Sequence, residues 1–466
     1  MNKKIISVLA YFLKSPTKAL ISTWIVWAIV LVSLPFSYTT PPSVLILGFI
    51  VGCILCFSIG DLITKLALSF AQKGQSSGWR GSQRSLLNPE RIQKNLKRLD
   101  RIILSLAIVG LLGGSLFVMA KFSLSGLNFS DGVTGARLQR ANDILSGNAG
   151  DTPFITYIGL LTFPCSSAAF LASFLHVGFT KNTLRWSRLS IISPFAVTIV
   201  TGGRGGILQI LVMFLSTILI RRYRKEAPMH QLISPKARKS LKTGKLFLVM
   251  AILFAVYNVY VFNSRRELTN SNFGASLVNW EQNYGIYPSP FLENMVSFGI
   301  LDGDLLLNVM QTYFYLTSGP SVFTILENSQ VNIGPYFGIY QVGLLSSFVD
   351  KFFADISPVP QMMSELAQAR IVGLLPSAWG MMFVDFGFLG TLLEAFALGC
   401  LSRIVYFLAI HRGWLGDKLM FSFVVMAIVM SPIAAPLGFS DSFFTLIVFL
   451  VVGKTLNHIS RNVSHV

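Results

Sequence analysis

The sequence predicts an all-α polytopic membrane protein of about ten transmembrane helices, and two observations lead to this fold class. The 466 residues are 53% hydrophobic and only 12% charged, with a mean hydropathy of +0.62. Apolar runs close to twenty residues long also recur along the chain, and a helix of this length crosses the hydrocarbon core of a bilayer. Both observations argue against a soluble domain.

The chain divides into a cytoplasmic interfacial helix, two groups of spans and one large loop. Residues 1–18 carry Lys3, Lys4, Lys14 and Lys18 among apolar residues, which is typical of a basic amphipathic helix rather than a cleaved signal. Seven spans are expected within 19–262, a periplasmic loop over 263–386, three spans within 387–457, and a cytoplasmic tail over 458–466. The spans are 19–38, 44–64, 102–120, 154–175, 189–200, 207–220, 246–262, 387–408, 419–435 and 443–457.

The distribution of basic residues orients the spans and explains the net charge of +18. With both termini in the cytoplasm, every predicted inside segment is rich in Lys and Arg, as topology rules require. This positive charge is a topogenic and lipid-facing signal rather than a nucleic-acid footprint. Of the 38 basic residues only eight fall outside: Lys121, Arg137, Arg140, Arg204, Arg265, Arg266, Lys351 and Arg370.

The large loop contains two moderately apolar stretches, 305–323 and 333–353, which are interrupted by Gly-Pro pairs. We expect interfacial or re-entrant helices there, although two further spans would preserve the same orientation, giving twelve. The loop is rich in aromatic residues, among them Tyr313 and Tyr336. These side chains suit sugar stacking, and they suit anchoring at the membrane interface equally well.

The feature that points to function is the segment Thr201-Gly-Gly-Arg204-Gly-Gly206 between two short spans. The flanking runs, 189–200 and 207–220, give only about 18 and 21 Å of helix at about 1.5 Å per residue, against a core of about 30 Å. We therefore expect Arg204 to be recessed by roughly 10 Å in a cavity open to the outside.

Glycines on both sides of Arg204 would permit positive φ and let a ligand approach the backbone N–H groups of Gly203 and Gly205. An arginine beside a helix N-terminus favours an anion, and a lipid-linked diphosphate fits this chemistry. The alternative is a tight hairpin whose arginine only snorkels to the surface.

The other outside arginines form weaker candidates for anion contacts. Arg265 and Arg266 follow the seventh span directly, where a solvated charge run is the alternative. Arg137 and Arg140 are three residues apart and would share a helix face. For Arg370, an ion pair within its own short helix is the alternative.

A general base on the outside would be a carboxylate, because all five histidines map to cytoplasmic segments. Glu267, Asp385 and Asp151 are the candidates, and the intramembrane Glu394 either lines the same cavity or pairs within the bundle. No cluster with metal-ligand spacing occurs outside, and the Cys53/Cys56 pair is expected to be part of the core. Arginines could then neutralise a departing diphosphate without a metal or other cofactor.

The pattern resembles the O-antigen polymerases (Wzy type), which are oligosaccharide repeat-unit polymerases. The likeness rests on the Gly-Gly-Arg204-Gly turn, the pair Arg265-Arg266 opening a large loop, and the segment 377–390 with its Asp385-Phe-Gly-Phe-Leu-Gly390 entry to a late helix. The segment with Arg137 and Arg140 also resembles an early periplasmic loop of these proteins. The resemblance covers roughly residues 100–410.

The resemblance implies a GT-C type glycosyltransferase of the bacterial inner membrane that joins undecaprenyl diphosphate-linked oligosaccharides at the periplasmic face. Arg204, Arg265 and Arg266 would hold the diphosphate, and a carboxylate would activate the acceptor. A chain-length regulator and a flippase of the same pathway would be partners. Two alternatives remain: an O-antigen ligase, whose periplasmic histidine this chain lacks, and a transporter of the same lipid-linked sugar, for which paired broken helices are missing from the sequence.

Overall fold

A computed structural model of the protein describes residues 15–75, 89–123, 153–176, 178–223, 243–268, 273–331, 333–353 and 356–461, with single positions at 132, 135–136 and 139. Regular structure is helical throughout, apart from two short strands, which confirms the all-α class. The strands, β1 (Phe36–Tyr38) and β2 (Ile286–Pro288), pair antiparallel and tie the first external connection to the large loop.

All ten predicted spans coincide with helices, and seven long apolar stretches could each cross a membrane, which indicates a multi-pass membrane protein. The prediction of ten spans differs because α9 and α19 are short, and because α10 contributes only the shorter apolar helix Gly205–Arg221. The helices that coincide with the ten predicted spans are α2 (Pro16–Ser33), α3 (Val44–Gln75), α4 (Pro89–Ser123), α6 (Phe154–Thr162) with α7 (Pro164–Leu175), α9 (Ile192–Val200), α10 (Gly205–Tyr223), α11 (Thr243–Leu268), α18 (Ser377–Phe407), α19 (Leu415–Met430) and α20 (Ser440–Arg461).

The local sequence explains several helix starts. The helix α4 begins at Pro89, with Glu90 in its first turn. Proline fits the first turn because its fixed φ is helical and its missing N–H would have no partner there. The short helix α8 (Lys181–Leu189) is capped by Thr180, whose hydroxyl accepts from the backbone N–H of Thr183.

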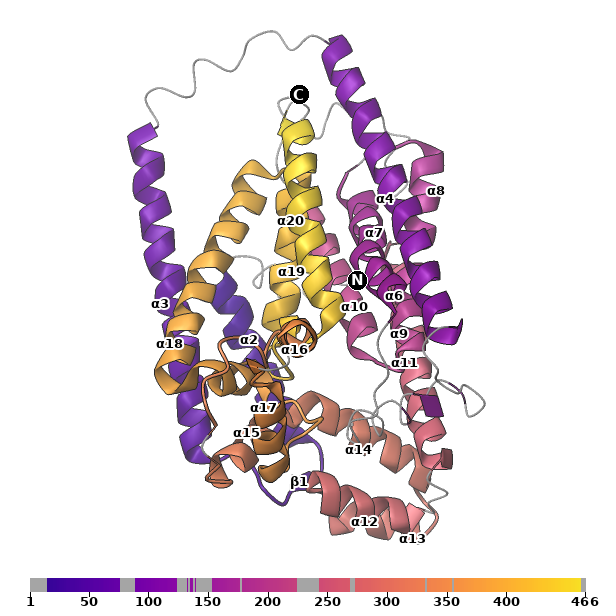
Figure 1. Cartoon of the computed structure of the whole chain (residues 1–466), viewed down its shortest axis with the longest axis vertical. Helices are drawn as coiled ribbons and strands as arrows, with labels where there is room; N and C mark the ends of the chain where they lie inside the picture. The colour runs from indigo at the N-terminus through magenta and orange to yellow at the C-terminus, as the bar shows by residue number, and fades with distance from the viewer. Residues whose placement is uncertain are drawn as a thin grey trace.

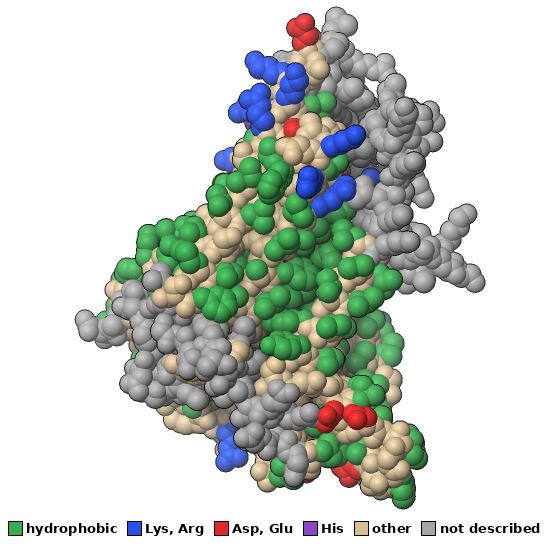
Figure 2. All heavy atoms as spheres, turned by 90° about the vertical axis from the view of Figure 1, so that its right-hand side faces the viewer, with side chains coloured by type: hydrophobic (Ala, Val, Ile, Leu, Met, Phe, Trp, Pro, Cys, Tyr) green, Lys and Arg blue, Asp and Glu red, His purple; other side chains and the backbone are tan. Residues whose placement is uncertain are grey.

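The surface carries the features of a protein in lipid. Figure 2 shows a belt of hydrophobic side chains between an end where Lys and Arg gather and an end where Asp and Glu gather. Many large apolar side chains of α11 remain exposed, for example Leu253 at 54% and Val256 at 62%. Such a continuous apolar surface is costly in water and favourable in a bilayer.

The large loop forms a cluster of short helices at one end of the bundle (Figure 1). Neither apolar stretch of the loop contains one of the seven long apolar helices. The helix α15 is nevertheless buried along most of its length, which fits a re-entrant element better than a surface one. These helices are α12 (Phe273–Tyr284), α13 (Pro290–Ser297), α14 (Gly303–Thr317), α15 (Gly319–Asn328), α16 (Gly343–Phe352) and α17 (Val359–Gln368).

The helix α18 begins ten residues before the expected boundary at 387, and Gly387 interrupts it with φ 65° and ψ −168°. Residues 377–386, which we assigned to the loop, are instead a mostly buried half-helix. Their start pairs with the buried connection between α19 and α20: Ala378 N–H donates to Ser431 O at 2.9 Å. This hydrogen bond satisfies part of the irregular backbone inside the protein, as is required of non-helical backbone within a membrane.

Candidate functional site

The Arg204 turn joins α9 to α10. Only one of its four glycines is needed for a positive φ angle. Gly202 has a φ of 61°, and its N–H donates to Ile199 O at 2.8 Å. The other glycines of the turn do not have positive φ, so only Gly202 uses the conformational freedom that the glycines provide. Gly206 is required for space instead, because a Cβ there would lie 2.5 Å from Thr198 Oγ1.

Arg204 occupies the N-cap position of α10, since its carbonyl accepts from Leu208 N–H at 3.2 Å. Its guanidinium lies between two aromatic rings, with Cζ 4.1 Å from the centroid of Phe262 and 4.9 Å from that of Tyr315. Nη1 donates to Asn258 Oδ1 at 3.1 Å, and Asn258 Nδ2 donates to Thr312 Oγ1 at 3.0 Å. Three helices, α10, α11 and α14, thus orient one partly buried arginine.

The Arg204 turn lies beside the second half of α11, where its guanidinium contacts Asn258. The helix continues ten residues beyond Asn258, to Leu268. At about 1.5 Å per residue, the Arg204 contact lies roughly 15 Å below that end of α11. In Figure 1, α14 lies between the end of the bundle that carries α9 and α10 and the helix α12.

A second polar group reaches the turn from α20. Asp441 is in the first turn of α20, partly exposed, and its Oδ2 would lie 2.7 Å from a Cβ at Gly206. Behind the turn lies a small cavity with a mixed lining, whose polar side chains are Ser167, Thr198, Gln209, Asp441 and Thr445. The N-termini of α10 and α20 therefore lie side by side, at one end of this cavity.

Two of the other predicted carboxylates hold the loop at 334–342. Asp385 is fully buried and accepts from the backbone N–H groups of Tyr340 and Gln341, at 2.9 and 2.7 Å. Glu394 accepts from Gln341 Nε2 at 2.9 Å. Asp385 thus has its hydrogen bonds filled by the fold, and Glu394 pairs with a loop residue within the bundle.

The two predicted tyrosines are both buried, with different partners. Tyr313 is 2% exposed, packs between Phe36 and Tyr38, and donates its hydroxyl to Leu31 O at 3.0 Å. Tyr336 is 4% exposed and donates to the Glu365 carboxylate. Both hydroxyls therefore hold parts of the protein together.

The Tyr336–Glu365 pair shifts the pKa of both partners. Burial, reinforced by the hydrogen bond to Glu365, raises the pKa of Tyr336 above its usual value. Burial also raises the pKa of Glu365, but hydrogen bonds from Tyr336, Gln361 and the backbone at Gly334 outweigh it. The net pKa of Glu365 is therefore lowered, and this carboxylate stays ionised at neutral pH.

Of the remaining predicted arginines in the described part of the chain, only two lie on a helix that contributes to the site. Arg265 and Arg266, with Glu267, lie on the last turns of α11, two helical turns beyond Asn258; their side chains lie outside what the structure describes. Arg137, Arg140 and Asp151 also lie outside the described residues. Arg370 is exposed at the end of α17, with φ 59°, far along the chain from the turn.

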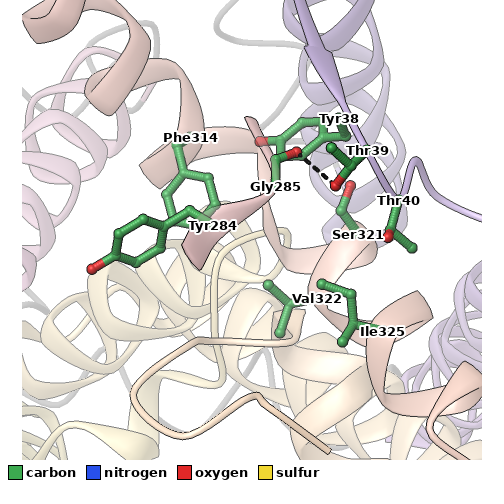
Figure 3. Close-up of a pocket in the computed structure, with 9 residues that line it drawn as sticks. All are labelled: Tyr38, Thr39, Thr40, Tyr284, Gly285, Phe314, Ser321, Val322 and Ile325. Atoms are coloured by element: carbon green, nitrogen blue, oxygen red, sulfur yellow. Dashed lines mark hydrogen bonds between the residues drawn. The ribbon is translucent and has the colours of Figure 1, made fainter. Parts of the chain in front are cut away.

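A further small pocket lies on the side of α14 that carries Phe314, the neighbour of Tyr315 (Figure 3). It lies between β1, β2, α14 and α15, and the hydroxyl of Thr39 donates to Gly285 O at 3.3 Å at one side of it. Its lining is Tyr38, Thr39, Thr40, Tyr284, Gly285, Phe314, Ser321, Val322 and Ile325.

The sequence did not single out Asn258, Tyr315 or Asp441 as site residues. Two of them are nevertheless polar residues within or next to an apolar run, which is a recognisable signal. Asn258 is an amide inside the apolar run 246–262, and Asp441 is a carboxylate just before the last one. Such residues in spans are functional candidates by default. Tyr315 could not have been singled out, because only the packing of α14 separates it from the loop's other aromatic residues.

Comparisons of the chain with known protein families, with characterised proteins and with solved structures found no match.

Proposed function

We propose that the protein is a membrane glycosyltransferase that polymerises undecaprenyl diphosphate-linked oligosaccharide units at the periplasmic face of the bacterial inner membrane. The observation that carries this proposal is the environment of Arg204. Its guanidinium is oriented by the neutral side chain of Asn258 and by two aromatic rings, at the N-terminus of α10. These contacts orient the guanidinium, and an oriented guanidinium at a helix N-terminus is suited to bind an anion.

The proposed chemistry assigns the diphosphate to the Arg204 turn. A guanidinium and a helix N-terminus both stabilise negative charge, and that charge grows on the diphosphate as the glycosidic bond breaks. Arg265 and Arg266, two turns further along α11, are proposed to extend the anion site toward the periplasm. A chain-length regulator and a flippase would act with the protein in the same pathway.

The proposed orientation has both termini in the cytoplasm and the Arg204 turn facing the periplasm. The separation of basic and acidic side chains at opposite ends of the apolar belt supports it (Figure 2). The end with Lys and Arg would face the cytoplasm, following the positive-inside rule.

The test is reconstitution of the purified protein in liposomes with a lipid-linked repeat unit, followed by gel analysis of the glycan. Wild-type protein should produce a ladder of chain lengths. Arg204→Ala should lower the rate by roughly 10²–10³, as removal of a charge-stabilising donor does. Arg204→Lys should remain impaired, because an ammonium cannot make the forked contact.

The matched control is Arg185→Ala on α8, an exposed arginine near the opposite end of the bundle, which should leave the ladder unchanged. Normal chain lengths with Arg204→Ala would show that the turn is structural and would refute the assignment. Membrane insertion of each variant is checked by its recovery in the membrane fraction.

A transporter of the same lipid-linked sugar is the second candidate, and one observation favours it. The break at Gly387 in α18 and the buried connection 431–439 supply the counterpart in the C-terminal half that the sequence did not show. Liposomes separate the two functions, since a transporter moves the intact lipid-linked unit across the bilayer without lengthening it. In cells, loss of a polymerase leaves single attached units, and loss of a flippase or a ligase leaves none.

A further inference from the structure

The carboxylate of Asp441 differs from every other described carboxylate of the candidate site, because it lies against the Arg204 turn itself. Gly205 and Gly206 are adjacent, with Cα atoms about 3.8 Å apart. A Cβ at Gly205 would lie 3.4 Å from Tyr315 Oη, on the side of Arg204, and one at Gly206 would lie 2.7 Å from Asp441 Oδ2. Asp441 therefore lies against Gly206, two residues along the chain from Arg204.

The hydrogen bonds of Asp441 leave its carboxylate available. Oδ1 accepts from the backbone N–H of Ser442 at 2.9 Å, and the Asp441 carbonyl accepts from Thr445 Oγ1 at 2.7 Å. Among the described residues, no cation forms an ion pair with it. Asp385, by contrast, is fully buried with both oxygens accepting backbone hydrogen bonds.

An independent observation points to a polar group entering the cavity that Asp441 lines. Gln209, 3% exposed, also lines this cavity, and its Nε2 has no hydrogen-bond partner in the part of the chain that the structure describes. Its Oε1 is held by Ser442 Oγ at 2.5 Å, which fixes the amide orientation. A buried donor without a partner is costly, so the site favours an oxygen acceptor such as a water or a hydroxyl.

We propose that Asp441 is the general base of the proposed glycosyl transfer, an inference that rests on the proposed function. The carboxylate takes the proton of the acceptor hydroxyl while the hydroxyl oxygen forms a bond to the anomeric carbon of the donor. The bond between that carbon and the diphosphate oxygen breaks, and the diphosphate leaves with the electron pair beside Arg204.

The test uses the full-length protein in liposomes and the variant Asp441→Asn. Asparagine keeps the shape and the acceptor oxygen for Ser442 N–H but cannot take a proton. Turnover should fall by roughly 10²–10⁴, the range for loss of general base catalysis, with KM for the donor within a few-fold of wild type. The control is Asp302→Asn, which changes an aspartate that only caps α14 and should leave turnover unchanged.

Turnover of Asp441→Asn within a few-fold of wild type would overturn the proposal, and so would a loss explained by KM alone. If Asp441→Asn does not fold, Asp441→Ser replaces it, with binding of undecaprenyl diphosphate as the measure of a folded site. The two proposals fail separately: a wild-type protein that makes no polymer refutes the proposed function, whereas an active Asp441→Asn refutes only the base.

Discussion

The side chain of Arg204, which is costly to place within an apolar bundle, is held in one orientation by its neighbours. The guanidinium lies over the rings of Phe262 and Tyr315, and Asn258 accepts a hydrogen bond from it. Contacts of this kind contribute about 0.5–2 kcal/mol each at partly desolvated sites. They restrict the orientation of the side chain, and a snorkelling arginine would not need such restriction.

The glycines of the turn have separable roles, which two alanine substitutions distinguish. Gly206→Ala should destabilise the protein by about 1–3 kcal/mol, because the new methyl group displaces Thr198 Oγ1 from Pro194 O and presses on Asp441. Gly203→Ala should cost less than about 1 kcal/mol, since its nearest neighbour would be 3.4 Å away.

The measurement for this pair is the unfolding free energy of each variant in mixed micelles. Equal losses for Gly203→Ala and Gly206→Ala would contradict the assignment of Gly206 to close packing. A larger loss for Gly203→Ala would show that the turn itself, and not its contact with α20, limits substitution.

At the level of elements, the protein combines long continuous helices with interrupted ones. The pair α3 and α18 runs side by side on one edge of the bundle (Figure 1), where Gly399 allows close approach, since a Cβ there would lie 2.0 Å from Phe57 O. The interrupted elements are the α9–α10 hairpin, α18 at Gly387 and the connection 431–439. These three bring buried backbone and polar side chains to the middle of the molecule.

The break in α18 should depend on Gly387. Its φ of 65° and ψ of −168° fall in a region that only glycine adopts readily, although no atom lies within 4 Å of a Cβ there. Gly387→Ala should therefore destabilise the protein by about 1–3 kcal/mol through backbone strain alone.

The matched control for the break is Gly48→Ala in α3, which also has open space around it but has helical backbone. This variant should be neutral or stabilising by up to about 1 kcal/mol. Thermal unfolding in detergent compares the two, and a Gly387→Ala protein as stable as Gly48→Ala would show that α18 can straighten.

At the scale of the whole molecule, one buried ion pair connects both ends of the chain. Arg403 on α18 pairs with Asp61 on α3, and Asp61 Oδ2 accepts from Ser15 and Thr17 at 2.8 and 2.6 Å. Asp61 is 3% exposed, so it would be buried without its cation if the arginine were removed. The start of α2 is thereby anchored to the C-terminal group of spans.

Arg403→Met should destabilise the protein by about 3–5 kcal/mol, because it leaves the Asp61 charge uncompensated. The double variant Asp61→Asn/Arg403→Met should lose less than the single one, since no buried charge remains and the introduced amide oxygen still accepts from Ser15 and Thr17. Unfolding in mixed micelles measures both, with the exposed Arg185→Met as a control expected within about 0.5 kcal/mol of wild type. A double variant less stable than the single one would contradict this account.

Much of the architecture was predictable from the sequence. Apolar length located the ten helices, because a bilayer requires about twenty apolar residues per span, and glycines enclosing Arg204 marked a turn. The half-helix 377–386 was not predictable, since Gly387 and Asp385 read locally as the end of a loop. Asp385 proved to be bonded to backbone N–H groups of a loop 45 residues away, which no local pattern encodes.

The sequence by itself determined the fold class, the positions of the apolar helices and the position of one unusual arginine, because hydrophobicity and backbone propensity act over a few neighbouring residues. Only the tertiary structure decided what surrounds that arginine. Asn258, Tyr315 and Asp441 come from three helices far apart in the chain, and their meeting depends on how α11, α14 and α20 pack. Packing is a property of the whole bundle, so the partners of Arg204 could not be derived from the sequence around it.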